Sequence, residues 1–321
     1  MNNILYDYMG NVVSRPPFST PEMYGAVGDG TTNDTLAVQA AISDQYARFT
    51  SGKIYKVTSP LRFKKDSYLD MNNATILSTS KRVFFNFEDG DSYGGYNGNG
   101  NITIANGTVI GGSVAFAHGN RIRFENVHFQ NCLNDHFMEI CTCTDYIVDK
   151  CSFVGMLNLD TSVLEYINID TNAVYGAFSH NKAGQNDPVF YDGSVSDGII
   201  VRDTYFSVGE GNYAYGFNAF GAHGRTISNT YTKNVTLVNN TIRGFTGCGI
   251  RINAMDGILV GDNDIQTVGD GIRIGDVADA KNIVVKGNYV VCDGTKLVRT
   301  SGYYTNLTVA NNVTQGDAQN F

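Results

Sequence analysis

Four segments in the C-terminal third of the chain repeat one short pattern: NVTLVNNTI at 234–242, DGILVGDNDI at 256–265, NIVVKGNYV at 282–290 and NLTVANNV at 306–313. Apolar residues alternate along each segment and are followed by a polar corner. The corner residues are Asn240, Asn263, Asn288 and Asn312, at spacings of 23, 25 and 24 residues. Upstream, IRFENVHF, YIVDKCSF and IIVRDTYF follow the same outline, with Val127, Cys151 and Thr204 at the asparagine position. The chain is therefore built from a repeat.

Each unit also contains a second apolar run, such as GIRINA at 249–254 or GIRIGD at 271–276, and leaves little room for a helix. One unit cannot bury its apolar face alone, whereas stacked units pair with their neighbours and share a core. We therefore predict an all-β fold, a single-stranded parallel β-helix. In-register stacking places equivalent residues about 4.8 Å apart on successive coils, so the corner asparagines should form a hydrogen-bonded ladder.

One stretch departs from strand-like alternation. Between residues 34 and 49, apolar residues recur at helical spacing: Val38, Ala41, Ile42 and Phe49. Asn33 or Asp34 is suited to the N-cap position of this helix. Because a stack of coils leaves its first coil open to water, an amphipathic helix at this point is expected to cap the stack.

The residues that precede this helix, YGAVGDGTTNDT at 24–35, contain glycines that are also typical of phosphate-binding loops. A dinucleotide site requires GxGxxG directly after an apolar strand, and a phosphate-binding loop requires GxxxxGK followed by Ser or Thr. Gly25, Gly28 and Gly30 fit neither spacing, and SRPPFSTPEM at 14–23 is not a strand. This pattern excludes both nucleotide motifs.

Together with VQAAI at 38–42, this stretch resembles the N-terminal motif of the pectate-lyase-like superfamily, which includes phage tailspikes, capsule depolymerases and bacterial alginate epimerases. The repeats extend a looser resemblance over most of the chain. The resemblance implies a right-handed β-helix, polysaccharide as the usual partner and, for phage members, a homotrimer on the virion tail or at a cell surface. It also implies that Asp29 and Asp34 are turn and cap residues.

Composition narrows the range of partners. The net charge of −8 argues against a basic groove for nucleic acid. MNNILYDYMG at 1–10 does not read as a signal peptide, and no apolar run approaches the ~20 residues of a membrane helix. We therefore expect no nucleic acid partner and no membrane insertion, and the partner that the resemblance implies is a bacterial surface polysaccharide.

The six cysteines raise the question of a metal site. Cys141 and Cys143 point the same way in a strand, but no second cysteine pair stands at a zinc-like spacing. The favoured interpretation is free thiols packed in the core. We predict no metal site and no cofactor; calcium is left open as an alternative that the sequence does not indicate.

The chain divides into an N-terminal extension (1–22), the lead-in motif and capping helix (23–53) and the β-helix (54–321). Two stretches, near 171–197 and 207–230, interrupt the repeat. Both mix glycine with aromatic residues, including Tyr175, Tyr191 and Tyr213. Such rings suit stacking on sugars, or they could pack against a neighbouring subunit, and the sequence leaves both interpretations open.

Aligning the second strands places HFMEI (136–140), EYINI (165–169), CGIRI (248–252) and DGIRI (270–274) side by side. Met138, Ile167, Ile250 and Ile272 then point inward. One polar column, facing outward, contains Glu139, Asn168, Arg251 and Arg273. A second, at the preceding corner, contains His136, Glu165 and Asp270, and Asp170 lies just beyond the first column.

These columns contain groups that can act on a sugar. A glycosidase needs two carboxyl groups ~5–9.5 Å apart, and a lyase acting on a uronic acid needs a base near the C5 proton and a cation on the carboxylate. Our candidate catalytic residues are His136, Glu139, Glu165 and Asp170. The candidate substrate-binding residues are Asn168, Arg251, Arg273, Tyr175, Tyr191 and Tyr213. The alternative interpretation is an ordinary solvated face.

The leading functional hypothesis is a phage-tailspike-like protein that binds and depolymerises a bacterial surface polysaccharide by hydrolysis or β-elimination. The alternative is a glycan-binding tail protein or adhesin that does not cleave, because one scaffold can carry both functions. A uronate epimerase ranks third.

Overall fold

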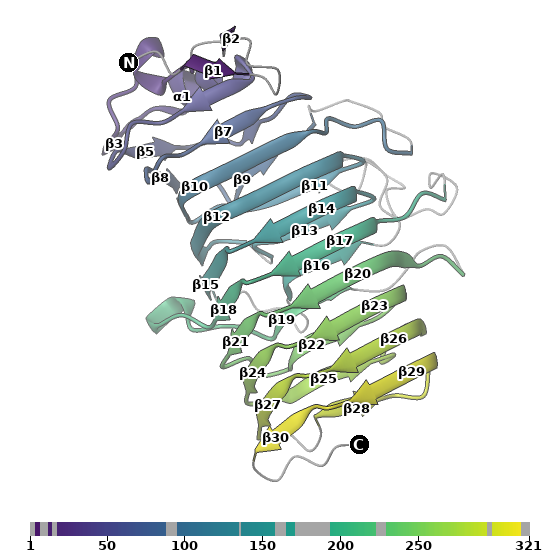
Figure 1. Ribbon diagram of the computed structural model, residues 1–321. Coiled ribbons are helices and arrows are strands. Elements are labelled where there is room, and N and C mark those ends of the chain that lie inside the picture. Colours follow the sequence, from purple (N-terminus) through teal and green to yellow (C-terminus); the bar gives the residue numbers. More distant parts are fainter. Residues whose placement is uncertain are drawn as a thin grey trace, which may run out of the picture.

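The computed structural model describes residues 18–87, 95–134, 136–157, 165–170, 193–222, 229–293 and 297–315, together with the backbone of 4–6 and 12–14. Over these residues the chain is an elongated right-handed parallel β-helix whose coils stack from one end to the other (Figure 1). The predicted fold class is confirmed. Among the described residues, no helix is long and apolar enough to cross a membrane.

A regular coil, such as β20 (Thr232–Val238), β21 (Thr241–Arg243) and β22 (Cys248–Ile252), contributes one strand to each of three parallel sheets. The long strands β10 (Ile102–Ile110) and β12 (Asn120–Cys132) continue through a corner and take part in both the first and the second sheet.

The remaining strands follow the same order. The first sheet also contains β4 (Tyr46–Arg48), β7 (Tyr68–Asp70), β14 (Thr144–Asp149), β17 (Asp197–Arg202), β23 (Met255–Gly261), β26 (Ala280–Lys286) and β29 (Tyr304–Ala310). The second contains β3 (Asp29–Asn33), β5 (Ile54–Val57), β8 (Thr75–Ser78), β15 (Ser152–Met156), β18 (Tyr205–Ser207), β24 (Asp264–Thr267), β27 (Tyr289–Cys292) and β30 (Val313–Gln315). The third contains β6 (Leu61–Arg62), β9 (Arg82–Phe85), β11 (Ser113–Ala117), β13 (Met138–Cys141), β16 (Glu165–Asp170), β19 (Asn218–Ala222), β25 (Asp270–Ile274) and β28 (Val298–Thr300). Outside these sheets, β1 (Ile4–Tyr6) and β2 (Val12–Ser14) form an antiparallel pair.

The predicted asparagine ladder lies at the corner between the first and second sheets. The main-chain amide and Nδ2 of Asn240 both donate to Oδ1 of Asn263, at 2.9 and 3.0 Å. The same two bonds link Asn263 to Asn288 and Asn288 to Asn312. Thr204 extends the ladder upstream by donating its main-chain amide to Oδ1 of Asn240. The residues just before these positions have positive φ, which suits Asn, Asp and Gly: Asp203, Asn239, Asp262, Gly287 and Asn311.

The interior is filled by columns of equivalent residues. Phe129, Phe153 and Phe206 occupy one register position on successive strands of the second sheet. Their ring centroids lie 5.0 and 5.2 Å apart, and the ring planes differ by only 1° and 11°. The stacked geometry follows directly from the coil spacing.

The N-terminal end of the stack is covered by α1 (Thr35–Ser43), which buries Val38, Ala41 and Ile42. The helix is shorter than the sequence spacing predicts. Gln45 has a φ of 68°, which ends the helical path, and the chain enters β4 one residue later. Phe49 is buried in the core, but outside the helix.

Asp34 occupies the N-cap position of α1. Its carboxylate nevertheless accepts the main-chain amides of Val27 and Gly28, at 2.8 and 3.0 Å, and so ties the lead-in motif to the start of the helix. Asp29 accepts the amides of Thr32 and Thr31 within its own turn. These backbone hydrogen bonds hold the pKa of Asp29 well below its usual range. Both aspartates are turn and cap residues, as expected.

One predicted interruption of the repeat is partly regular. Within 207–230, β19 pairs with β16 on one side and β22 on the other, so it supplies the third-sheet strand of its coil. The excursion before it contains the 3-10 turn η4 (Gly211–Tyr213). Another 3-10 turn, η1 (Pro21–Tyr24), precedes the lead-in glycines.

All six cysteines are buried free thiols, as predicted. Burial raises the pKa of Cys143 and of Cys151 to about 12. These thiols therefore remain neutral and act as small apolar groups.

The ladder should contribute measurably to stability. Asn263 is 1% exposed, and its amide makes four hydrogen bonds, to Asn240, Asn288 and the carbonyl of Leu237. We expect Asn263→Ala to lower the free energy of unfolding by ~1–3 kcal/mol, because buried donors and acceptors lose their partners. Chemical denaturation measures this change. Asn312→Ala, at the half-buried end of the ladder, is the matched control and should cost less; equal losses would contradict the prediction.

An ion-pair group on the first sheet should make stability depend on pH. Oδ2 of Asp149 contacts Nη2 of Arg202 at 2.8 Å and Nη2 of Arg123 at 2.9 Å, on the two adjacent strands. The hydrogen bond from Arg202 outweighs burial and lowers the pKa of Asp149. The stabilisation is therefore complete above the unfolded pKa of ~3.9 and is lost as pH falls through the lower folded pKa.

We accordingly expect Asp149→Asn to be less stable than the wild type at neutral pH, by ~1–3 kcal/mol. The two proteins should converge in strongly acidic buffer. Urea unfolding across that pH range measures the difference. Asp203→Asn, at an exposed corner position, should show little difference at any pH, and a pH-independent loss in Asp149→Asn would refute this account.

Candidate functional site

The third sheet brings the predicted site residues into the expected register. Met138 pairs with Ile167, Ile167 with Phe220, Phe220 with Ile250 and Ile250 with Ile272. The inward positions are therefore as predicted. The outward column reads Glu139, Asn168, Gly221, Arg251, Arg273 and Arg299, and the preceding column reads Glu165, Asn218, Cys248 and Asp270.

In contrast to the alternative interpretation, most of these polar side chains are buried, and only Arg273 and Arg299 at the C-terminal end of the column are more exposed. Glu165 and Asn168 are at most 1% exposed, and Arg251 is 5% exposed. Glu139 and Asp270 are buried as well. Charges in such an environment must be paired or hydrogen-bonded, so their partners define the chemistry of the site.

The predicted catalytic residues fall into two groups. Upstream, the carboxylate of Glu139 is held by both terminal nitrogens of Arg82, at 2.8 and 3.3 Å. Nδ1 of His136 donates to the main-chain carbonyl of Glu165 at 2.6 Å. Because a carbonyl only accepts, this nitrogen carries the proton. The two residues are thus anchored separately, by a cation and by the backbone.

Asp170 lies at the end of β16 and is half-buried. It accepts hydrogen bonds from Nδ2 of Asn168 at 3.2 Å and from the thiol of Cys141 at 3.3 Å. Burial first, and then the nearby charge of Asp170, raise the pKa of Cys141 well above its usual value. Both groups that donate these hydrogen bonds to Asp170, the Cys141 thiol and the Asn168 amide, are therefore uncharged.

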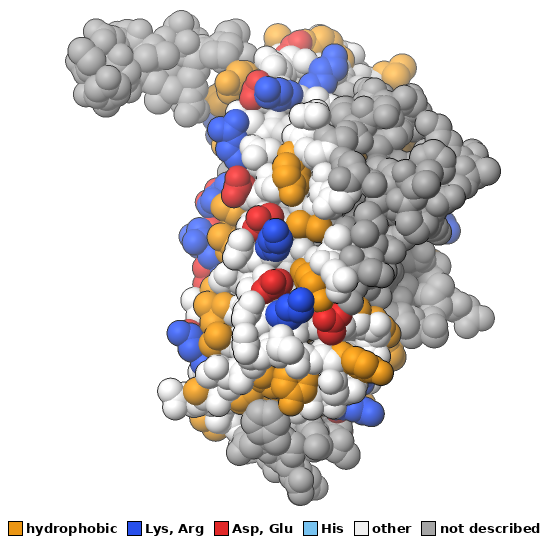
Figure 2. Space-filling model, turned by 90° about the vertical axis from the view of Figure 1, so that its right-hand side faces the viewer, with side chains coloured by type: hydrophobic (Ala, Val, Ile, Leu, Met, Phe, Trp, Pro, Cys, Tyr) orange, Lys and Arg blue, Asp and Glu red, His pale blue; other side chains and the backbone are white. Residues whose placement is uncertain are grey.

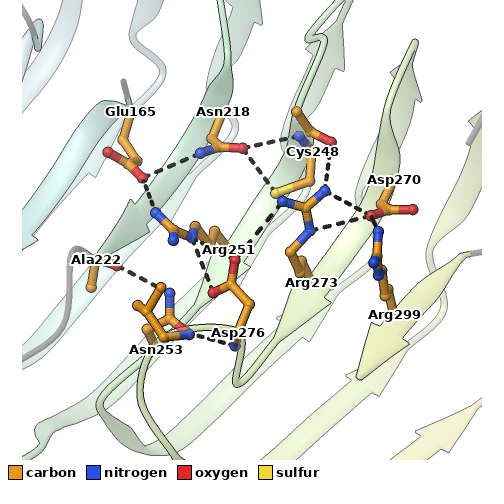
Figure 3. Close-up of polar contacts among 12 residues, drawn as sticks. Glu165, Asn218, Ala222, Cys248, Arg251, Asn253, Asp270, Arg273, Asp276 and Arg299 are labelled. Atoms are coloured by element: carbon orange, nitrogen blue, oxygen red, sulfur yellow. Dashed lines mark hydrogen bonds and ion pairs between the residues drawn. The ribbon is translucent and has the colours of Figure 1, made fainter. Parts of the chain in front are cut away.

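The downstream group is centred on Arg251 (Figure 3). Nη1 of Arg251 lies 3.1 Å from Oε1 of Glu165, and Nε lies 3.1 Å from both carboxylate oxygens of Asp276. Burial by itself lowers the pKa of Arg251. The contacts with Asp276 and Glu165 raise this pKa by more than burial lowers it, so the net shift is upward. Asn253 accepts the main-chain amide of Asp276 at 3.1 Å and fixes the loop that bears this carboxylate.

Two further arginines continue the same column toward the C-terminal end of the stack. Nη2 of Arg273 lies 2.8 Å from Oδ2 of Asp270, and Nη1 of Arg299 lies 3.5 Å from the same oxygen. Arg273 also approaches Asp276 at 3.8 Å. The side chain of Arg299 is 54% exposed, against 6% for Arg251. Positive charge therefore becomes more accessible along the column.

The ion pair between Glu165 and Arg251 crosses an intervening strand. These residues lie on β16 and β22, and β19 runs between them. At the crossing point stands Gly221, where a Cβ would lie 2.7 Å from Cγ of Glu165 and 3.2 Å from Cβ of Arg251. Nδ2 of Asn218 donates to Glu165 at 3.2 Å from the same strand. The missing side chain of Gly221 thus makes room for the ion pair.

The three acids Glu165, Asp270 and Asp276 are balanced by the three arginines of this column. The arrangement offers carboxylates for proton transfer and an accessible cation for an acidic sugar. Of the three acids, Asp276 has the most exposed side chain, at 17%, against 5% for Asp270 and 0% for Glu165. No cluster of three or more His, Cys, Asp or Glu residues able to hold a metal occurs in the described parts of the chain.

The predicted aromatic contacts lie elsewhere. Tyr175 and Tyr191 fall outside the described residues. Tyr213, on η4, lies beside Gly155 of β15, at the second sheet rather than the third: a Cβ on Gly155 would be 3.3 Å from Cβ of Tyr213. Tyr213 therefore lies beside the second sheet, whereas the arginine column belongs to the third.

Sequence reasoning missed several members of the site. Asn218 and Gly221 belong to NAFGA at 218–222, which matches the outline of EYINI but was assigned to an interruption. Asp276 follows GIRIG directly, at a corner that the strand alignment did not cover. Arg82 is found in RVFF at 82–85, where a register shift between Ser113 and Val114 breaks the simple alignment.

We expect Gly221→Ala to destabilise the protein by ~1–3 kcal/mol, because the new methyl group overlaps the side chain of Glu165. A double-mutant cycle by chemical denaturation tests the cause: in a Glu165→Ala background the same change should cost less. Gly261→Ala, whose Cβ would make only ordinary contacts from 3.4 Å outward, is the control. Equal costs in both backgrounds would contradict this assignment.

No family model matches the chain. Plasmin and fibronectin-binding protein A of Streptococcus pneumoniae is 23% identical over 291 residues, which cover 78% of this chain and 40% of that protein. The capsule K30/K69-specific depolymerase of Klebsiella phage K64-1 is 31% identical over 109 residues, which cover 26% of this chain and 14% of the depolymerase. The chain thus spans less than half the length of each of these curated relatives.

Solved structures agree on the architecture. The crystal structure of the pneumococcal surface adhesin PfbA covers 94% of this chain and 82% of its own, with a TM-score of 0.77 at 20% identity. ORF18 of Geobacillus virus E2 covers 92% of this chain and 61% of its own, with a TM-score of 0.60 at 14% identity. These similarities, with the observed sheets and ladder, show that the chain has a right-handed parallel β-helix fold.

Proposed function

We propose that the chain is a carbohydrate-active protein that binds and depolymerises a bacterial surface polysaccharide, with the Glu165–Arg251–Asp276 group as its reactive centre. The observation that carries this proposal is the convergence of three carboxylates and three arginines from neighbouring coils on one side of the third sheet. The Klebsiella phage relative, which is named as a capsule depolymerase, supports the substrate class.

In this proposal Asp276 meets the substrate first, because its side chain is the most exposed of the three acids. In hydrolysis, Asp276 and a second carboxylate from the same group supply the acid and the base or nucleophile. In β-elimination, one carboxylate takes the C5 proton, the C4–C5 double bond forms as the C4–O bond breaks, the leaving oxygen takes a proton from an acid or from water, and a cation binds the uronate. Arg299 is better suited to that role than Arg251, because Arg251 is engaged by two carboxylates.

The proposal places the protein outside the bacterial cytoplasm, on a virion tail or at a cell surface. A curated relative that is a phage depolymerase and a structural neighbour described as a surface adhesin support this location. The homotrimer that the tailspike resemblance implies remains a prediction.

The test is to incubate the purified chain with a panel of purified capsular and exopolysaccharides. Unsaturated ultraviolet absorbance identifies β-elimination, and new reducing ends without that absorbance identify hydrolysis. We expect Asp276→Asn and Glu165→Gln to slow cleavage by ~10²-fold or more, as for loss of an acid–base group. Glu125→Gln removes a carboxylate that pairs with Arg123 on the first sheet and should leave the rate unchanged. Wild-type rates in both site variants would refute the assignment.

A second function, glycan binding without cleavage, is favoured by two observations. Glu139, Glu165, Asp270 and Asp276 are each already paired with arginine, and the PfbA adhesin shares the fold over 94% of the chain. Retention of the protein on an immobilised polysaccharide that it leaves intact would support this alternative. A changed uronate composition without shortening of the polymer would instead indicate an epimerase.

A further inference from the structure

A hollow lies beside the capping helix α1, at the N-terminal end of the stack, and the proposed function does not use it. Its volume is about 440 Å³, which falls within the ~300–1,000 Å³ of small-molecule sites. One wall is a face of α1, and the other is the stretch that leads into β6 and follows it. The lining residues include Leu36, Gln39, Ser59, Pro60, Arg62 and Lys64.

The hollow is cationic, although the net charge of the chain is −8. Arg62 and Lys64 line it, and no acid is among the described residues that do so. The nearest acids in the sequence, Asp34, Asp44 and Asp66, accept hydrogen bonds from groups outside the lining. Elsewhere, Figure 2 shows several Lys and Arg side chains, on one side of the molecule, with an acidic side chain next to them. The hollow therefore favours an anionic ligand.

The walls of the hollow are held together by the side chain of Gln39. Its Oε1 accepts the main-chain amide of Arg62 at 2.8 Å, and its Nε2 donates to the carbonyl of the same residue at 3.0 Å. The side-chain amide thus pairs with β6 as a neighbouring strand does. Arg62 is placed in turn by Phe85, because its guanidinium carbon lies 5.6 Å from the ring centroid, within the range of a cation–π contact. The site is therefore formed before a ligand arrives, which reduces the entropy lost on binding.

The lining groups suit a sugar ring that carries the negative charge. A guanidinium stacks through its face, whereas its N–H donors lie in its plane and match the two oxygens of a carboxylate. Ser59 adds an exposed hydroxyl group. Leu36, which is 86% exposed, and Pro60 add apolar surface for the C–H groups of a ring. A bare inorganic anion is too small for the hollow, since a molecule the size of water takes only about 30 Å³.

We propose that this hollow is a second glycan subsite, which binds a uronate unit of the polysaccharide on which the third-sheet site acts. For the kind of ligand, this inference rests on the proposed function. Arg62 belongs to the same outward column of the third sheet as Glu139 and Arg299. Six strand-to-strand steps separate β6 from β22, which bears Arg251, or ~29 Å at ~4.8 Å per step. A polymer long enough to reach both sites is held by both, which raises its affinity over that of a short oligosaccharide.

Methyl NMR of the full chain, labelled at leucine, tests this inference by titration with glucuronate. Leu36 is the reporter because it lines the hollow, and its signal is identified by its loss in Leu36→Ile. We expect glucuronate to shift this signal saturably. The dissociation constant should rise ~10-fold or more in Arg62→Gln, which loses hydrogen bonds between charged groups. It should rise ~2–5-fold in Lys64→Ala, because that side chain is exposed. Glucose, which lacks the carboxylate, should bind at least ~10-fold more weakly than glucuronate.

Lys65→Ala is the matched control, because Lys65 is also exposed but is not among the lining residues; it should leave the dissociation constant unchanged. Inorganic sulfate should compete more weakly than glucuronate. Circular dichroism melts check that every variant is folded. No shift of the Leu36 signal, equal binding of glucose or of sulfate, or equal losses in Lys64→Ala and Lys65→Ala would each overturn the proposal.

The titration needs no cleavage, so the two proposals fail separately. A chain that cleaves a polysaccharide but binds no glucuronate in the hollow lacks the second subsite only. A chain that binds glucuronate there but cleaves nothing lacks the depolymerase activity only.

Discussion

The stacking of each coil directly on the next, about 4.8 Å away, is the constraint on which the rest of this structure depends. Residues at equivalent positions of successive coils therefore form columns along the axis of the molecule. An apolar residue becomes a column, as in the stacked rings of Phe129, Phe153 and Phe206. An amide at the corner becomes a ladder. A charge can pair with the opposite sign on an adjacent coil, as Asp149 does with Arg123 and Arg202.

Because of this constraint, much of the fold is predictable from the sequence. The asparagine positions and the inward residues Met138, Ile167, Ile250 and Ile272 follow from the spacing of the repeat alone. The errors arise where the spacing changes. The end of α1 depends on the positive φ of Gln45, and β19 was hidden between two irregular stretches. The periodicity of the sequence identifies equivalent residues on successive coils. It does not predict the path of the irregular segments that join them.

The candidate site was less predictable for a related reason. The strand register brings Glu165 and Arg251 to one face of the sheet. Their contact also requires a residue without a side chain, Gly221, on the strand between them. The apolar–polar alternation of the sequence does not identify such a glycine. Burial of the outward columns was also missed, since strand alternation distinguishes only the two faces of a sheet. The resulting group is charge-balanced and mostly buried. Its most accessible groups are Asp276 and Arg299.

The asparagine ladder also has a direction. In Asn240, Asn263 and Asn288, the main-chain amide and Nδ2 both donate to Oδ1 of the asparagine on the next coil, and Nδ2 also donates to a main-chain carbonyl of the previous coil. Aligned amide dipoles add, and chains of hydrogen bonds polarise one another. The bonds between the asparagines therefore run in one sense along the molecular axis, from the donors of each coil to the Oδ1 acceptor of the next.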